Sequence, residues 1–299
     1  MDQPIDGRPG FNALQLYKRS MKEATKTEFN LPNSFATPTM RILLTNDDGI
    51  HAPGLYALYE VLRAEFDLTI VAPESEMSAV GHAITLNLPL RVQHVVRNGA
   101  FYGYAVTGTP ADCVKIAVKE LMGAPPDIII SGINLGRNVG VDILYSGTVS
   151  AATEGAFLGC RSAAISLDTR QSPDFRFAAQ FSKEIIRFIK DNGVRDGTAL
   201  NVNIPAVPPE EITGVAITRQ GVARFEERFE RRNDPRGNVY YWLAGETPLE
   251  NGGPDTDSQL LKDKKITITP IHYDLTCMDE LARLRACTPP RLGHLKRGD

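Results

Sequence analysis

Cysteine is scarce in this sequence, and the few cysteines follow no structural pattern. Four in 299 residues are too sparse for a disulfide-stabilised scaffold, and their spacing matches no zinc-ligand pattern. We therefore expect reduced thiols in a cytoplasmic protein. The four are Cys113, Cys160, Cys277 and Cys287.

Excess positive charge and long apolar runs are also missing. The formal net charge is -3, which leaves no basic footprint for a nucleic-acid duplex and no polybasic segment for an anionic membrane surface. No apolar run approaches the roughly 18 residues of a membrane span, and the N-terminus lacks the apolar core of a secretion signal. We expect neither a nucleic-acid duplex nor a membrane as a partner.

The pattern that stands out is a short apolar run that breaks into carboxylates. Residues 42–44 are continuously apolar, which is typical of a strand buried on both faces. Asp47 and Asp48 follow, and because neighbouring side chains of a strand point to opposite faces, they converge only on a turn beyond it. An Asp-Asp-Gly alone is more often a surface turn. Adjacent carboxylates nevertheless repel unless a cation lies between them, so the pair indicates a divalent metal.

Apolar periodicity predicts strands that alternate with helices. Strand–helix–strand units with right-handed crossovers build a parallel sheet. Residues 83–96 and 101–106 alternate around a turn at 97–99, which predicts a β-hairpin excursion. The other predicted strands are 42–44, 68–72, 127–130, 163–167, 199–204, 214–218, 239–243 and 265–271. The predicted helices begin at Pro53 and Pro110 and cover 149–158 and 174–190.

Four of the predicted strands are followed by polar residues. Parallel strands end at the same edge of a sheet, so Asp47, Asp48, Ser78 and Asn134 are predicted to meet there. All four offer oxygen, which favours magnesium, manganese or calcium over zinc. The five histidines form no pair at a metal-ligand spacing.

Two predicted helix starts suit an anion. Gly108 and Thr109 precede one helix, with Thr109 as its N-cap, and Ser146, Gly147 and Thr148 lead into a second helix of small residues. Free N–H groups and the positive end of the helix dipole attract negative charge at such starts. Together with a hard cation, they predict a phosphate site.

Several segments resemble the SurE family of nucleoside-monophosphate phosphatases in order and spacing. The resemblance extends from Met40 to about Thr276. It implies an α/β fold, a Rossmann-like three-layer α/β/α sandwich with a C-terminal extension used in oligomerisation, and it implies dephosphorylation of 5'- and 3'-nucleotides. The matching segments are 44–50, 71–82, 106–113, 130–134 and 142–149.

The resemblance also assigns roles to residues. Asp47, Asp48, Ser78 and Asn134 match the family's divalent-metal ligands, which implies one Mg²⁺ or Mn²⁺ per subunit. We take Asp48 as the candidate catalytic base. The predicted phosphate and substrate contacts are Asn46, Gly108, Thr109, Asn138, Ser146, Gly147 and Thr148.

The sequence divides into three parts. Residues 1–39 are an irregular extension with weak helical character at 12–28, and they are either a functional arm or the product of a start codon placed too early. Residues 40–276 are the SurE-like domain, with its catalytic core over 40–200 and an oligomerisation arm within 201–276. The tail over 277–299 matches no motif. Within the arm, 219–232 is expected to be a solvated helix or hairpin face, and we expect a homodimer or homotetramer.

The predicted function is hydrolysis of nucleoside monophosphates by a metal-dependent phosphomonoesterase. A nicotinamide-dependent oxidoreductase would carry G-x-G-x-x-G after the first strand, where this chain has Asn-Asp-Asp-Gly. A dehalogenase-type phosphatase would carry D-x-D there. A metal-dependent nucleotide sensor without catalysis stays open, because binding residues alone do not establish turnover.

Overall fold

The computed structural model describes residues 40–169, 173–222, 226–246 and 253–290. The N-terminal extension over 1–39, its weakly helical stretch and the end of the tail lie outside the described residues.

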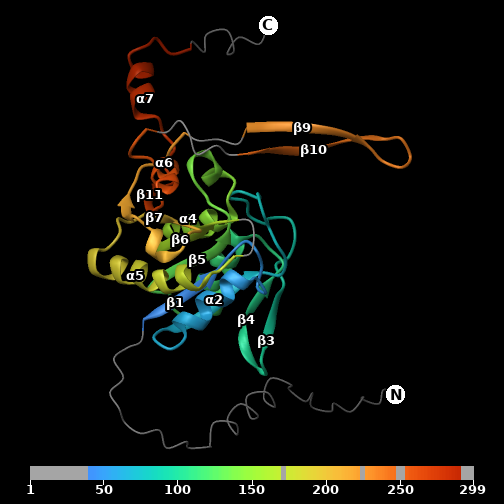
Figure 1. Ribbon diagram of the computed structural model, residues 1–299, viewed down its shortest axis with the longest axis vertical. Helices are drawn as coiled ribbons and strands as arrows, with labels where there is room; N and C mark the ends of the chain where they lie inside the picture. The colour runs from blue at the N-terminus through green and yellow to red at the C-terminus, as the bar shows by residue number, and fades with distance from the viewer. Residues whose placement is uncertain (1–39, 170–172, 223–225, 247–252, 291–299) are drawn as a thin grey trace, which may run out of the picture. The chain divides into compact units, whose positions relative to one another are not determined.

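A mixed sheet forms the middle of the described body (Figure 1). Its nine described strands follow the order β3-β4-β2-β1-β5-β6-β7-β11-β8. The strands from β4 to β7 in this order run parallel, whereas β3 and β11 run antiparallel to β4 and β7. The strands are β1 (Arg41–Thr45), β2 (Asp67–Pro73), β3 (Val92–Arg97), β4 (Ala100–Val106), β5 (Ile128–Leu135), β6 (Arg161–Asp168), β7 (Thr198–Pro205), β8 (Gly214–Ile217) and β11 (Lys265–His272).

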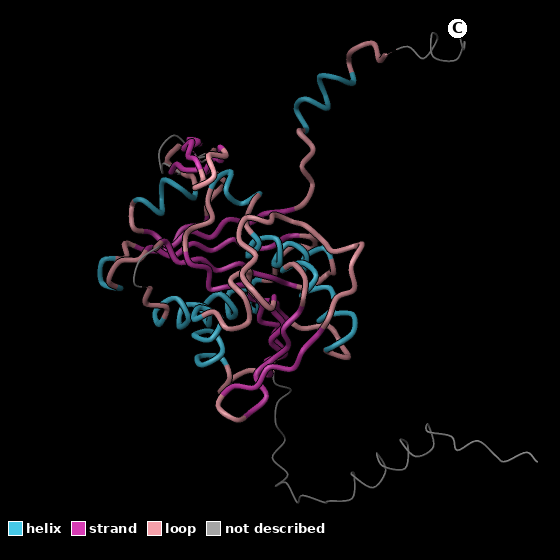
Figure 2. Tube along the Cα trace, turned by 90° about the vertical axis from the view of Figure 1, so that its right-hand side faces the viewer, coloured by secondary structure: helices cyan, strands magenta, loops and turns pink. Residues whose placement is uncertain are grey.

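Helices cover both faces of this sheet. Helices α2 (Pro53–Leu62) and α5 (Arg176–Asn192) pack together on one face, and α3 (Pro110–Ile116) and α4 (Gly147–Phe157) pack together on the other. Figure 2 shows the same strands between helices from a second direction. The predicted three-layer α/β/α sandwich is therefore confirmed. The remaining described elements are η1 (Ala117–Leu121), η2 (Gly140–Leu144), η3 (Pro209–Glu211), α6 (Asp257–Lys262) and α7 (Met278–Arg285).

Strand β1 shows why a continuous apolar run forms a central strand. Ile42 and Leu44 belong to the core beneath α2 and α5, and Leu43 belongs to the core beneath α3 and α4. All three side chains are fully buried. Burial of each large aliphatic side chain contributes about 1.5–3 kcal/mol, so both helical layers depend on this strand.

The predicted hairpin excursion is confirmed in part. Strands β3 and β4 pair antiparallel around a turn in which Asn98 and Gly99 both have positive φ angles. The predicted strand over 83–91 is wrong, because these described residues bind the start of α3 instead of a neighbouring strand. The backbone N–H of Thr85 donates to Asp112, and the carbonyl of Ala83 accepts from Thr109.

A second, two-stranded sheet stands apart from the first. Strands β9 (Glu226–Asn233) and β10 (Val239–Glu246) pair antiparallel with each other, and Figure 1 shows them as a long ribbon. The predicted strand over 239–243 is confirmed. Within the segment 219–232, residues 226–232 form one strand of this hairpin. The closely spaced charges of β9 suit a solvated strand.

Candidate active site

A pocket of about 780 Å³ opens beyond the carboxyl ends of β1 and β5. The chain runs from β1 to β2 on one side and reaches β5 on the other side later. Open α/β sheets bind ligands at such a reversal of strand order. The predicted site residues that line this pocket are Asp47, Asp48, Ser78, Asn134, Asn138 and Ser146.

Asp47 lies against the first turn of α4. The Thr148 hydroxyl donates to Asp47 Oδ1, and the backbone N–H groups of Gly147 and Thr148 also donate to this carboxylate. A Cβ atom at position 147 would lie 2.7 Å from Asp47 Cβ, so this close approach requires glycine. Burial raises the pKa of Asp47, and these hydrogen bonds oppose that rise. The N-terminus of α4 therefore binds the Asp47 carboxylate and is not open to a ligand.

Asp48 is less buried than Asp47 and lies among like charges. Burial, followed by the negative charge of Asp47, raises the pKa of Asp48 to about 6, and Glu76 adds to the rise. The backbone N–H of Leu135 donates to Asp48, and this hydrogen bond opposes the rise in its pKa. Three carboxylates beside one pocket repel each other, and a cation bound between them would remove that repulsion.

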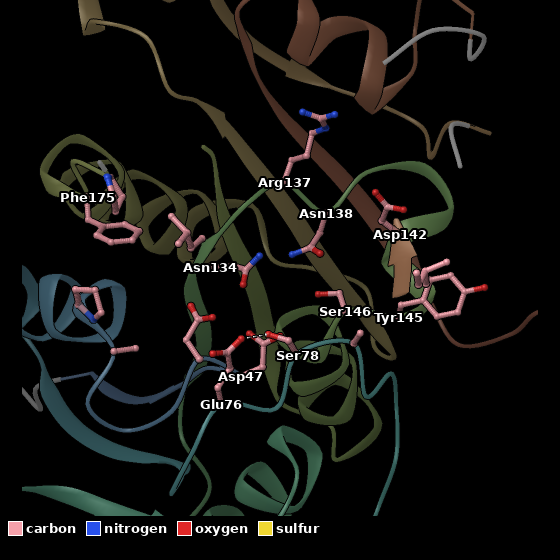
Figure 3. A pocket seen from close by; sticks show the side chains of 17 residues that line it. Asp47, Glu76, Ser78, Asn134, Arg137, Asn138, Asp142, Tyr145, Ser146 and Phe175 are labelled. Atoms are coloured by element: carbon pink, nitrogen blue, oxygen red, sulfur yellow. Dashed lines mark hydrogen bonds between the residues drawn. The ribbon is translucent and has the colours of Figure 1, made fainter. Parts of the chain in front are cut away.

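The neutral site residues also present oxygen. Asn134 donates its Nδ2 to the Gly136 carbonyl at 2.7 Å, which leaves its Oδ1 for the side that faces Asp47 in Figure 3. Ser78 Oγ lies 2.6 Å from Glu76 Oε1 and donates to it. Two carboxylates, an amide oxygen and a hydroxyl suit a hard divalent cation.

In the part of the chain that the structure describes, no group of three or more His, Cys, Asp or Glu residues is arranged to hold a metal ion. A cation at this pocket therefore needs the serine and asparagine oxygens as well as the aspartates. The donor set fits Mg²⁺ or Mn²⁺ and does not fit zinc, which prefers nitrogen and sulfur ligands.

Five predicted phosphate contacts are not among the residues that line the pocket: Asn46, Gly108, Thr109, Gly147 and Thr148. Gly147 and Thr148 bind Asp47 instead. The Thr109 hydroxyl accepts from Asp112 N, and the Thr109 N–H donates to Asp112 Oδ2, so Thr109 and its neighbour Gly108 shape the start of α3. Asn46 is fully buried and exchanges hydrogen bonds with the backbone of Gly49. It closes the turn that carries the two aspartates.

Asn138 is held by a buried polar network that the sequence reasoning missed. Its N–H donates to Asn203 Oδ1 at 2.7 Å, and its Nδ2 donates to Ser166 Oγ at 2.9 Å. The amides of Asn201 and Asn203 both donate to its carbonyl. The signal was present, because two asparagines alternate with aliphatic residues in the predicted strand over 199–204.

Asp257 holds the next part of the same loop. It is fully buried, its Oδ2 accepts from Gly140 N at 3.0 Å, and its Oδ1 accepts from Gly221 N at 2.8 Å. Burial raises the pKa of Asp257, and these backbone hydrogen bonds oppose the rise. Asp257 thereby joins the C-terminal third of the chain to the pocket loop, a contact that no local pattern predicts.

The pocket has an acidic part and a part with apolar side chains. Phe175 and Tyr145 line it on opposite sides in Figure 3, both away from Asp47, and Asp142 lies beside Tyr145. Leu243 of β10 lines the pocket as well. Arg137 also lines the pocket and pairs with Asp168 at 2.8 Å. A cation held by the acidic part would attract an anionic group of a ligand, and the apolar side chains would suit a flat apolar group of the same ligand.

The fold and the pocket define an α/β protein whose pocket, at the switch point of its sheet, is lined by oxygen donors that suit a hard cation. The chain belongs to the SurE family, because the family model described as survival protein SurE matches residues 42–227. The resemblance inferred from the sequence motifs is thereby confirmed.

Curated relatives and a solved structure agree with this assignment. The chain is 57% identical over 248 residues to the 5'-nucleotidase SurE of Syntrophus aciditrophicus (strain SB), which covers 83% of this chain and 93% of the relative. It is 55% identical over 237 residues to that of Syntrophobacter fumaroxidans (strain DSM 10017 / MPOB), covering 79% and 95%. The crystal structure of SurE protein from Aquifex aeolicus superposes with a TM-score of 0.71 at 38% identity, over 82% of this chain and 98% of that chain.

Proposed function

We propose that this chain is a metal-dependent phosphomonoesterase that hydrolyses nucleoside 5'-monophosphates to nucleoside and phosphate. One observation carries the proposal: Asp47, Asp48, Ser78 and Asn134 come from three separate strand ends and line one pocket. The names of the relatives from Syntrophus and Syntrophobacter, 5'-nucleotidase SurE, support the substrate class. The volume of about 780 Å³ falls in the range of small-molecule sites.

One Mg²⁺ or Mn²⁺ per subunit is the proposed cofactor. Asp47, Asp48, Ser78 and Asn134 would hold it. When bound, such a cation offsets the negative charge that develops on the phosphoryl oxygens during hydrolysis.

The chain's own residues orient the reactants in this proposal. Asp48 accepts a proton from the attacking water, since it is the more accessible carboxylate of the pair. The α4 start, Gly147 and Thr148, fixes Asp47. Ser146 and Asn138 contact the phosphate or the ribose from the pocket wall. Asn46, Gly108 and Thr109 act through the turn and the helix start that they shape.

Phosphate release from 5'-AMP in the presence of Mn²⁺ tests this function, with 3'-AMP as a second substrate and EDTA as the metal-free control. We expect release from both nucleotides with Mn²⁺ and none with EDTA. A sensor without catalysis would bind 5'-AMP and release no phosphate, and that outcome would overturn the proposal.

We further propose that the enzyme is a cytoplasmic homodimer or homotetramer, assembled through the arm within 201–276. In the hairpin of β9 and β10, Phe229, Tyr241 and Trp242 are each more than half exposed, although large apolar surfaces are usually covered. Cys113, Cys160, Cys277 and Cys287 are free thiols. No helix among the described residues has the length and apolar character to cross a membrane.

A further inference from the structure

Ser78 is the proposed metal ligand that lies furthest along the chain from a strand. It lies in the segment 74–91, between the end of β2 at Pro73 and the start of β3 at Val92. Ser78 itself is exposed, and the residue after it, Ala79, has a φ angle of 56°. A non-glycine residue in the left-handed region needs surrounding contacts to keep it there.

Three contacts bracket Ser78. On its N-terminal side, the backbone N–H of Met77 donates to the Asp47 carbonyl at 2.7 Å. On its C-terminal side, the Gly81 N–H donates to the Tyr145 carbonyl at 2.9 Å, and His82 Nε2 lies 2.8 Å from Glu154 Oε2. The His82 ring also stacks on Phe157, with 5.1 Å between ring centroids and 10° between planes. Both His82 partners belong to α4.

Glu154 is a buried carboxylate, and both of its oxygens have partners. Its side chain is 4% exposed, and its other oxygen accepts from Lys115 Nζ of α3 at 2.6 Å. Burial by itself raises the pKa of Glu154, but the hydrogen bonds from His82 and Lys115 outweigh burial and leave the pKa below its usual value. Glu154 is therefore an ionised anchor between two helices and the Ser78 segment.

The same helix holds the other side of the site. Gly147 and Thr148, at the start of α4, donate hydrogen bonds to Asp47, and Glu154 and Phe157 hold His82 two turns further along. One rigid element thus carries both Asp47 and the Ser78 segment.

We propose that His82 is a positioning residue, whose contact with Glu154 holds the segment around Ser78 on helix α4 so that Ser78 stays beside Asp47. The expected effect on metal binding rests on the proposed metal site, whereas the contact that anchors the segment belongs to the chain itself. Nothing in the proposed hydrolysis requires His82 to touch the substrate, and it does not line the pocket.

The first test measures hydrogen exchange in metal-free protein. In His82→Ala, the backbone amides of residues 76–83 should exchange about tenfold faster, because the segment loses its contact with α4. Amides of β1 and β5 should keep their wild-type rates. Unchanged exchange over 76–83 would overturn the proposal whatever the enzyme does.

The second test is Mn²⁺ binding by calorimetry. Groups that orient metal ligands typically contribute 10- to 100-fold to affinity, so His82→Ala should raise the Mn²⁺ dissociation constant by about tenfold or more. His82→Gln places an amide N–H near the position of Nε2 and should come within about threefold of wild type. Equal losses in both variants would show that ring packing on Phe157, and not the bond to Glu154, is what matters.

Lys183→Gln is the matched control, because it removes an ion pair with Glu65 that lies between other elements. It should leave both measurements unchanged. A wild-type protein that binds Mn²⁺ but releases no phosphate would refute the proposed hydrolysis and leave the anchor supported. Wild-type Mn²⁺ affinity in His82→Ala would refute the anchor and leave the proposed hydrolysis intact.

Discussion

The hydroxyl of Thr148 donates a hydrogen bond to the carboxylate of Asp47, although the two residues are 101 positions apart. Asp47 lies just beyond the end of β1, and Thr148 lies in the first turn of α4. The contact joins the first strand of the fold to a helix of the opposite half of the sheet, and it fixes one of the two carboxylates on which the proposed metal site depends.

Substitution of either aspartate should abolish activity, but the two substitutions should differ in their effect on stability. We expect Asp47→Ala and Asp48→Ala each to abolish phosphate release from 5'-AMP. Asp47→Ala also leaves buried donors of Thr148 and Gly147 without an acceptor, which should cost about 1–3 kcal/mol of unfolding free energy. Asp48→Ala should cost less, because Asp48 is less buried and its removal also relieves the repulsion from Asp47 and Glu76. Urea unfolding and a phosphate assay at saturating Mn²⁺ measure both, and near-normal turnover in either variant would refute the ligand assignment.

Thr148 should matter through its hydroxyl. Thr148→Val keeps the shape of the side chain and removes the donor to Asp47, so we expect Mn²⁺ affinity to fall by about tenfold or more. Thr148→Ser keeps the hydroxyl and should bind Mn²⁺ within about threefold of wild type. Similar affinity in both variants would mean that the hydrogen bond does not orient Asp47.

Glu154 should give stability a dependence on pH. The pKa of Glu154 in the folded protein lies below its unfolded value of 4.5. Ionised Glu154 therefore adds to the free energy of unfolding above pH 4.5, and this contribution is lost as pH falls through the folded pKa. Glu154→Gln should therefore be less stable than wild type at pH 7, by about 1–3 kcal/mol, and the difference should shrink below pH 4.5. Urea unfolding at both ends of this range measures the change, and a constant difference would contradict it.

The hairpin of β9 and β10 should carry the assembly. Trp242 is 57% exposed, and Trp242→Asp would place a charge in an apolar subunit contact. We expect wild type to sediment as a dimer or tetramer at micromolar concentration, and the variant to shift towards the monomer. Lys190→Ala, at an exposed position outside residues 201–276, is the control. A monomeric wild type would refute the proposed assembly.

Removal of residues 1–39 should leave activity and melting temperature unchanged. Strand β1 begins at Arg41, so the described sheet is complete without them. A protein that starts at Met40 tests this. A melting temperature lower by several degrees, or a loss of turnover, would show that the extension belongs to the working protein.

By itself the sequence determined the central strand, the alternation of strands and helices, and the set of oxygen-bearing residues at the strand ends. These are local properties, because a continuous apolar run and a polar break leave their mark within a few residues. The strand wrongly predicted over 83–91 marks the limit of such patterns: the segment alternates, but its backbone binds α3.

Only the tertiary structure decided which residues hold the site in place. Asn203 and Asp257 fix the loop around Asn138, Leu243 reaches the pocket from the hairpin, and His82 meets Glu154. Each of these contacts joins segments far apart in the chain. The residues next to each side chain in the sequence would suit an exposed position equally well, so they do not predict the contact. Their partners are set by how the sheet orders its strands, which periodicity along a single sequence does not encode.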